Sequence, residues 1–81
     1  MITSKAWPKG FVEFHFVGGQ PVTINVNMIS FISEVAKDTD NWKVGKRCHI
    51  LALGHNNGGF YVTETYKEVQ ETIRLAVEGL K

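Results

Sequence analysis

The stretch that decides the fold is Gly54-His55-Asn56-Asn57-Gly58-Gly59-Phe60-Tyr61-Val62-Thr63-Glu64-Thr65-Tyr66-Lys67-Glu68-Val69. Its glycines and asparagines are typical of a hairpin turn, because both residue types tolerate positive φ. Residues 60–63 then predict a short strand. Thr65, with Glu68 three positions later, has the spacing of a capping box, in which two side chains satisfy amide groups at a helix N-terminus. The stretch therefore predicts a turn, a strand and the start of a helix, in that order.

The residues after Thr65 predict an amphipathic helix that ends near Gly79. Polar residues such as Lys67, Gln70 and Glu71 fall outside its apolar stripe. A helix of this kind in a short chain is expected to lay its stripe on a sheet. The stripe consists of Tyr66, Val69, Ile73, Ala76, Val77 and Leu80.

Four further strands are predicted upstream, at residues 11–17, 22–26, 29–35 and 47–53. Side chains alternate along a strand, so every second side chain points toward the core. The inward sets expected in the first three strands are Val12, Phe14 and Phe16, then Val22, Ile24 and Val26, then Ile29, Phe31 and Val35. In the third strand the alternative set, Ser30, Ile32 and Glu34, is much less apolar. That leaves Ile32 on the opposite face.

The strand at 47–53 carries apolar residues on both faces, which favours a central strand that is covered on both sides. Residues 36–46 are polar and show no hydrophobic periodicity, which predicts a loop. The order of strands followed by one helix predicts an α+β fold, an antiparallel β-sheet of about five strands with one C-terminal helix packed on one face. Residues 1–10 would form an N-terminal arm, and residues 11–81 a single domain.

Composition narrows the classes of function. The chain has 81 residues, of which 43% are hydrophobic and 21% charged, as in an average soluble domain. A formal net charge of +1 argues against a strong electrostatic field that would attract nucleic acids or membranes. No apolar run has the length of a membrane helix. The single cysteine and an N-terminus without an export signal suggest a cytoplasmic protein. A small domain without a disulfide often gains stability by oligomerising.

No catalytic signature is present, and no enzyme activity, cofactor or metal is expected. Cys48 and His49 are neighbours on one strand and point to opposite faces, so they cannot share a metal site. Cys48 is predicted to be a buried structural thiol. The glycines of residues 54–59 lack the lysine of a phosphate-binding loop and favour a hairpin turn.

Two surfaces are candidates for interaction. Four apolar residues are left over after the helix has covered one face of the sheet, namely Ile32, Leu51, Leu53 and Phe11. We expect either the arm with Trp7 or a second copy of the chain to cover them. The alternative is a nucleic-acid site, because aromatic rings beside cations stack bases and neutralise phosphates. Asp38 and Asp40 in the same loop argue against this alternative. Its residues would be Trp42, Lys43, Lys46, Arg47 and His49.

Three segments carry a resemblance, namely Val22-Thr23-Ile24-Asn25, Ile32-Ser33-Glu34 and the run from Val62 to Val69. In their order and spacing the chain resembles the small FlbD-like proteins of bacterial flagellar operons, and similar short proteins of bacteria and their phages. The resemblance covers roughly residues 11–78. The N-terminal arm and the 36–46 loop are longer here than in that family.

The resemblance implies a compact β-rich domain that acts through contacts, as a regulator or an assembly factor, with no enzyme activity or cofactor. Our first hypothesis is therefore a small non-enzymatic, cytoplasmic protein–protein interaction module of bacterial or phage origin. We expect it to bind itself as a homo-oligomer and to bind a further protein. The second hypothesis is a small nucleic-acid-binding regulator that uses residues 42–49.

Overall fold

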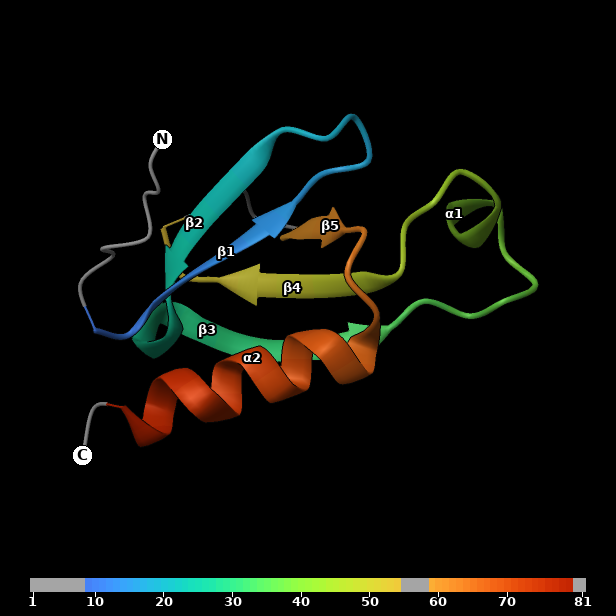
Figure 1. Cartoon of the computed structure of the whole chain (residues 1–81). Helices are drawn as coiled ribbons and strands as arrows, with labels where there is room; N and C mark the ends of the chain where they lie inside the picture. Colours follow the sequence, from blue (N-terminus) through green and yellow to red (C-terminus); the bar gives the residue numbers. More distant parts are fainter. Residues whose placement is uncertain (1–8, 55–58, 80–81) are drawn as a thin grey trace.

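The computed structural model describes residues 9–54 and 59–79. Figure 1 shows strands crossing in front of one another, with one long helix along the lower side and a small helical turn at the far end. The elements in chain order are β1 (Phe11–His15), β2 (Pro21–Asn25), the 3-10 turn η1 (Val26–Met28), β3 (Ile29–Glu34), α1 (Asp40–Lys43), β4 (Cys48–Ala52), β5 (Phe60–Val62) and α2 (Tyr66–Glu78).

The five strands form two antiparallel sheets. β1 and β2 make a hairpin, with Val12 opposite Ile24, and β3, β4 and β5 form a second sheet in that order. The α+β class, the antiparallel pairing and the C-terminal helix agree with the sequence prediction, but one continuous sheet is not confirmed. The sheets meet at one corner, where the backbone N–H of Thr63 donates to the carbonyl of His15 at 2.8 Å.

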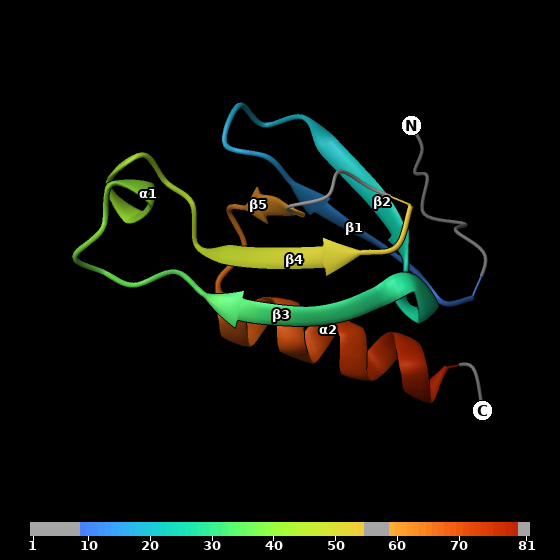
Figure 2. The same cartoon turned by 180° about the vertical axis from the view of Figure 1, so that it is seen from behind.

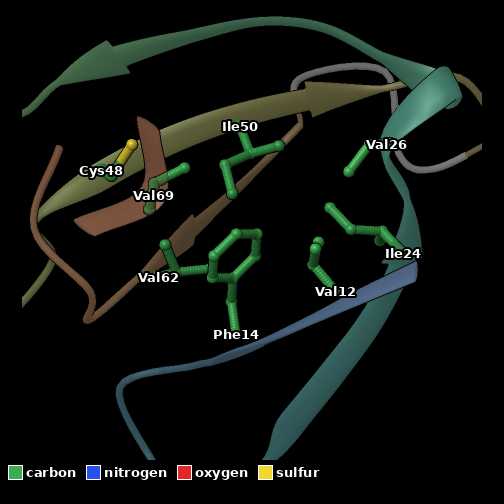
Figure 3. Packing of buried hydrophobic residues seen from close by; sticks show 8 residues of the cluster. All are labelled: Val12, Phe14, Ile24, Val26, Cys48, Ile50, Val62 and Val69. Carbon is green, nitrogen blue, oxygen red and sulfur yellow. The ribbon is translucent and has the colours of Figure 1, made fainter. Parts of the chain in front are cut away.

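The core lies between the hairpin, the three-stranded sheet and α2 (Figure 3). Phe14 is 1% exposed and occupies the middle of it, close to Val62 in the same view. Burying a side chain of this size stabilises the fold by roughly 1.5–3 kcal/mol. The inward positions predicted for the first two strands are confirmed at four residues, and Cys48 is buried as expected. The buried cluster is Val12, Phe14, Ile24, Val26, Cys48, Ile50, Val62 and Val69.

The inward set predicted for β3 is wrong at Phe31. The pairing of β3 with β4 shifts between Ile29 and Phe31, as in a β-bulge. An extra residue at this point exchanges the faces of the residues that follow it. Phe31 is consequently 51% exposed, whereas Ile32 is half-buried and packs against the core. The sequence prediction placed Ile32 on the face away from the core, and this is wrong.

The capping box at the start of α2 is confirmed. The hydroxyl of Thr65 accepts a hydrogen bond from the backbone N–H of Glu68 at 3.1 Å, and the carboxylate of Glu68 accepts one from the N–H of Thr65 at 2.9 Å. Val69 is fully buried, and Tyr66, Ile73 and Ala76 pack against the core beside it. Val77 is exposed and does not belong to this contact, and Leu80 lies outside the described residues.

The loop predicted at residues 36–46 contains the one-turn helix α1. Its N-cap is Thr39, whose hydroxyl accepts a hydrogen bond from the backbone N–H of Trp42 at 3.4 Å. The turn after β4 begins at Gly54, where φ is +86°, and the hairpin predicted through residues 55–58 lies outside the described residues. The same holds for the arm at residues 1–8, so the predicted docking of Trp7 stays a prediction.

Candidate interaction face

One face of the three-stranded sheet points away from the core, and we call it the outer face. Side chains alternate along β4, so Cys48, Ile50 and Ala52 point inward while His49 and Leu51 point outward. Strand partners lie on the same side of a sheet. The register therefore adds Phe31, Ser33 and Tyr61 to the outer face. Figure 2 views β3 and β4 from this side, with α2 behind β3 and α1 at the left end of the sheet.

Three rings cross the middle of the outer face, one from each strand. The ring centroids of Phe31 and His49 are 6.2 Å apart, and those of His49 and Tyr61 are 4.7 Å apart. Both pairs are tilted, at 51° and 48°, an arrangement within the usual range for aromatic contacts. The rings thus form a continuous row across β3, β4 and β5.

One end of the outer face is apolar, and we call it the apolar end. It consists of Met28, Phe31, Leu51 and Leu53, at the start of β3 and the end of β4. The backbone N–H of Leu53 donates to the carbonyl of Met28 at 2.7 Å, which holds these two positions together. Met28 is 46% exposed and Leu53 is 63% exposed. The outward side chains of β4, His49 and Leu51, are half-buried. The cover expected on this face, either the arm with Trp7 or a second copy of the chain, stays a prediction.

The other end of the outer face carries cations and aromatic rings. The guanidinium carbon of Arg47 lies 3.8 Å from the centroid of the Trp42 ring, and Arg47 Nη1 donates to the Trp42 carbonyl at 2.7 Å. Lys46 Nζ lies 4.7 Å from the centroid of the Tyr61 ring. Arg47 therefore stabilises the loop that carries α1, because its hydrogen bond and its cation–π contact are both made with Trp42.

The structure brings most of the residues proposed for a nucleic-acid site to this end. Trp42 lies in α1, with Arg47 against its ring, Lys46 lies over the Tyr61 ring, and His49 continues the row of rings. Lys43 does not join them, since its ammonium lies 4.0 Å from Asp40 Oδ1 and its side chain is largely exposed. Tyr61 was not singled out by the sequence, although its alternation with the buried Val62 was a signal that could have found it.

A hollow of about 210 Å³ opens beside the rings of His49 and Tyr61. Ser33, Glu34, Thr39 and Asn41 contribute polar side chains to its lining. Asn41 Nδ2 donates to the Tyr61 hydroxyl, and Lys46 Nζ donates to Asn41 Oδ1, both at 3.4 Å. These hydrogen bonds are long, so they hold the lining only weakly.

A separate cluster of titratable groups joins β1 to the segment before α2. His15 Nδ1 lies 2.7 Å from Glu64 Oε2, and His15 Nε2 lies 3.3 Å from Glu13 Oε2. The hydrogen bond with Glu64 raises the pKa of His15, with the negative charges of Glu64 and Glu13 acting in the same direction and burial opposing them. No pattern in the sequence indicates this pairing, because Glu64 lies 49 positions from His15.

Cys48 offers no reactive thiol. It is fully buried, and burial raises the pKa of its thiol to about 11. The neutral thiol therefore dominates at physiological pH, as suits a structural core residue. Across residues 9–54 and 59–79, no three His, Cys, Asp or Glu side chains gather as a metal site would require.

The helices of the described part of the chain are all too short or too polar to span a membrane.

Comparison with known proteins found no matching family model, no matching curated protein and no matching solved structure. The resemblance to FlbD-like proteins stays a prediction.

Proposed function

We propose that this chain is a small non-enzymatic protein–protein interaction module that associates with itself through the apolar end of the outer face. The observation that carries the proposal is the gathering of Met28, Phe31, Leu51 and Leu53 at one end of a sheet whose other side already forms the core. Phe31 and Leu53 are each more than half exposed.

The physical argument rests on the cost of leaving these side chains in water. Contiguous apolar patches on a small soluble domain mark contact sites more often than scattered single residues do. Burial in a contact would recover about 25 cal/mol for each Å² of apolar surface removed from water. The exposed apolar residues of α2 do not make a comparable patch, because Leu75 and Val77 are two positions apart and do not face the same side.

A second copy of the chain is the partner that this surface suits directly. In a two-fold dimer the same patch lies on both subunits, so one contact covers both copies of Phe31 and Leu53. β3 is also an edge strand of its sheet among the described residues. Edge strands that lack lysine and proline are prone to pair with other chains, and β3 has neither.

The wider role follows only from the resemblance. FlbD-like proteins suggest a cytoplasmic regulator or assembly factor in a bacterium or a phage, with a further protein as partner. In this proposal self-association presents one composite surface to that partner.

Sedimentation velocity over a range of concentrations tests the proposal. Wild-type protein should sediment as a dimer or larger species at the higher concentrations and dissociate on dilution. Leu53→Ser should sediment as a monomer throughout. Leu75→Ser is the matched control, because Leu75 is 55% exposed on α2, and it should behave as wild type. A wild-type protein that stays monomeric at all concentrations would contradict the proposal.

A further inference from the structure

The end of the outer face opposite the apolar end has a different chemistry. We define the ring hollow as the cavity lined by Ser33, Glu34, Val35, Ala36, Thr39, Asn41, His49 and Tyr61, with Lys46 beside it. We propose that the ring hollow binds one unpaired base of a single-stranded nucleic acid. This inference goes beyond self-association and rests on His49, Tyr61 and Lys46, which lie outside the apolar end, whereas Phe31 belongs to both surfaces.

The rings supply the stacking surface. His49 and Tyr61 are partly exposed neighbours on β4 and β5, with centroids 4.7 Å apart. Every base has a π-face, so aromatic side chains on a sheet surface stack bases with little regard to sequence. Phe31 extends the row by one more ring, 6.2 Å from His49, toward the apolar end. A single-stranded nucleic acid that lies across β5, β4 and β3 would thus meet three rings in succession.

The lining of the hollow suits the polar edge of a base. Ser33 presents a hydroxyl, and Asn41 presents both a donor and an acceptor. The two hydrogen bonds of Asn41, to the Tyr61 hydroxyl and from Lys46, are each 3.4 Å long. A base edge can therefore replace them at small cost, because bonds of this length are weak.

The local charge decides which nucleic acid fits. Residues 34–47 contain four cations, Lys37, Lys43, Lys46 and Arg47, and three carboxylates, Glu34, Asp38 and Asp40. Arg47 is also engaged with Trp42. The excess of positive charge is small, so stacking must supply most of the binding free energy. A duplex hides its base faces and is bound mainly through phosphates. A single strand exposes its bases and is the form that this site recognises.

The same argument fixes the salt dependence. Lys46 is the cation placed beside the rings, 4.7 Å from the Tyr61 centroid, so about one phosphate contact is expected. The logarithm of the binding constant should then fall against the logarithm of salt concentration with a slope of about −0.7. A polycationic surface would give a much steeper slope.

The test is fluorescence anisotropy with a short fluorescein-labelled oligothymidylate as the probe. Wild-type protein should bind the single strand more tightly than a labelled duplex of the same length. Tyr61→Leu should weaken binding by about tenfold, the range expected for the loss of one stacking ring. Tyr61→Phe keeps the ring and should bind nearly as wild type. Lys46→Gln should flatten the salt dependence, whereas Lys67→Gln on α2 should leave it unchanged.

Three results would overturn the inference: no binding of the single strand, equal or tighter binding of the duplex, or equal affinity of Tyr61→Leu and Tyr61→Phe. Circular dichroism on each variant shows whether it is folded. If Tyr61→Leu is unfolded, Lys46→Gln, whose side chain is partly exposed, gives an independent answer. Leu53→Ser separates the two proposals. If Leu53→Ser still binds the oligothymidylate, the ring hollow is independent of self-association. If Leu53→Ser no longer binds it, that independence is refuted.

Discussion

Glu64 accepts two hydrogen bonds from His15, one from the backbone N–H at 3.0 Å and one at the ring Nδ1 at 2.7 Å. The carbonyl of the same histidine accepts from the backbone N–H of Thr63. These contacts fix the end of β1 to the segment that leads from β5 into α2. They join the hairpin to the end of the three-stranded sheet, and they give the fold a titratable link.

The link predicts a pH dependence of stability. Because the pKa of His15 is raised in the folded chain above 6.5, protonated His15 stabilises the fold. That contribution is complete below the unfolded pKa and is lost as the pH rises through the raised folded value. The free energy of unfolding of wild type relative to His15→Asn should therefore decrease from about pH 6 to about pH 8.

Urea denaturation at each pH measures this difference. The effect should be small, because the side chain of His15 is 43% exposed and water screens its charge partners. The subtraction removes the pH dependence that the two proteins share. A difference that stays constant, or grows, as the pH rises would show that the ion pair with Glu64 does not stabilise the folded state.

The capping box of α2 gives a second prediction. Thr65→Ala removes the acceptor for the backbone N–H of Glu68 and should lower the free energy of unfolding by about 1 kcal/mol. Lys67→Ala, on the exposed side of the same helical turn, is the control and should change stability by less than about 0.5 kcal/mol. The urea midpoints of the three proteins compare them directly. Equal midpoints for Thr65→Ala and Lys67→Ala would mean that the cap contributes nothing.

The buried side of α2 gives a third prediction. Val69→Asp places a carboxylate where the wild-type side chain is 0% exposed, and it should unfold the domain. Leu75→Asp, at an exposed position on the same helix, should remain folded. Far-ultraviolet circular dichroism with thermal melting distinguishes these outcomes. A cooperative melt of Val69→Asp near the wild-type temperature would mean that this face of α2 does not cover the core.

The sequence predicted what depends on local pattern. The inward placement of Ile24 and Val26 and the three-residue spacing of Thr65 and Glu68 each involve neighbouring positions, and both are confirmed. The error at Phe31 has a physical origin, since a bulge costs little and leaves no mark in the composition of β3, yet it exchanges both faces. The pairing of His15 with Glu64 joins distant parts of the chain, and no periodicity encodes such a contact.

The candidate face was predicted in part for the same reason. Leu53 and His49 follow from the alternation of β4, and both are on the surface or partly exposed. The exposure of Phe31 required the register of β3, and the role of Arg47 required its contact with Trp42. The sequence grouped these cations as one alternative site, whereas in the fold Arg47 holds the loop that contains α1.

The central claim is that the apolar end of the outer face is a contact between copies of this chain. Amide nitrogen–proton correlation spectra, recorded while the protein is diluted, test it most directly. The account predicts that the signals of Phe31, Leu51 and Leu53 shift with concentration, while those of Leu75 and its neighbours on α2 do not. Shifts confined to α2, or no shifts at any residue of β3 and β4, would contradict it.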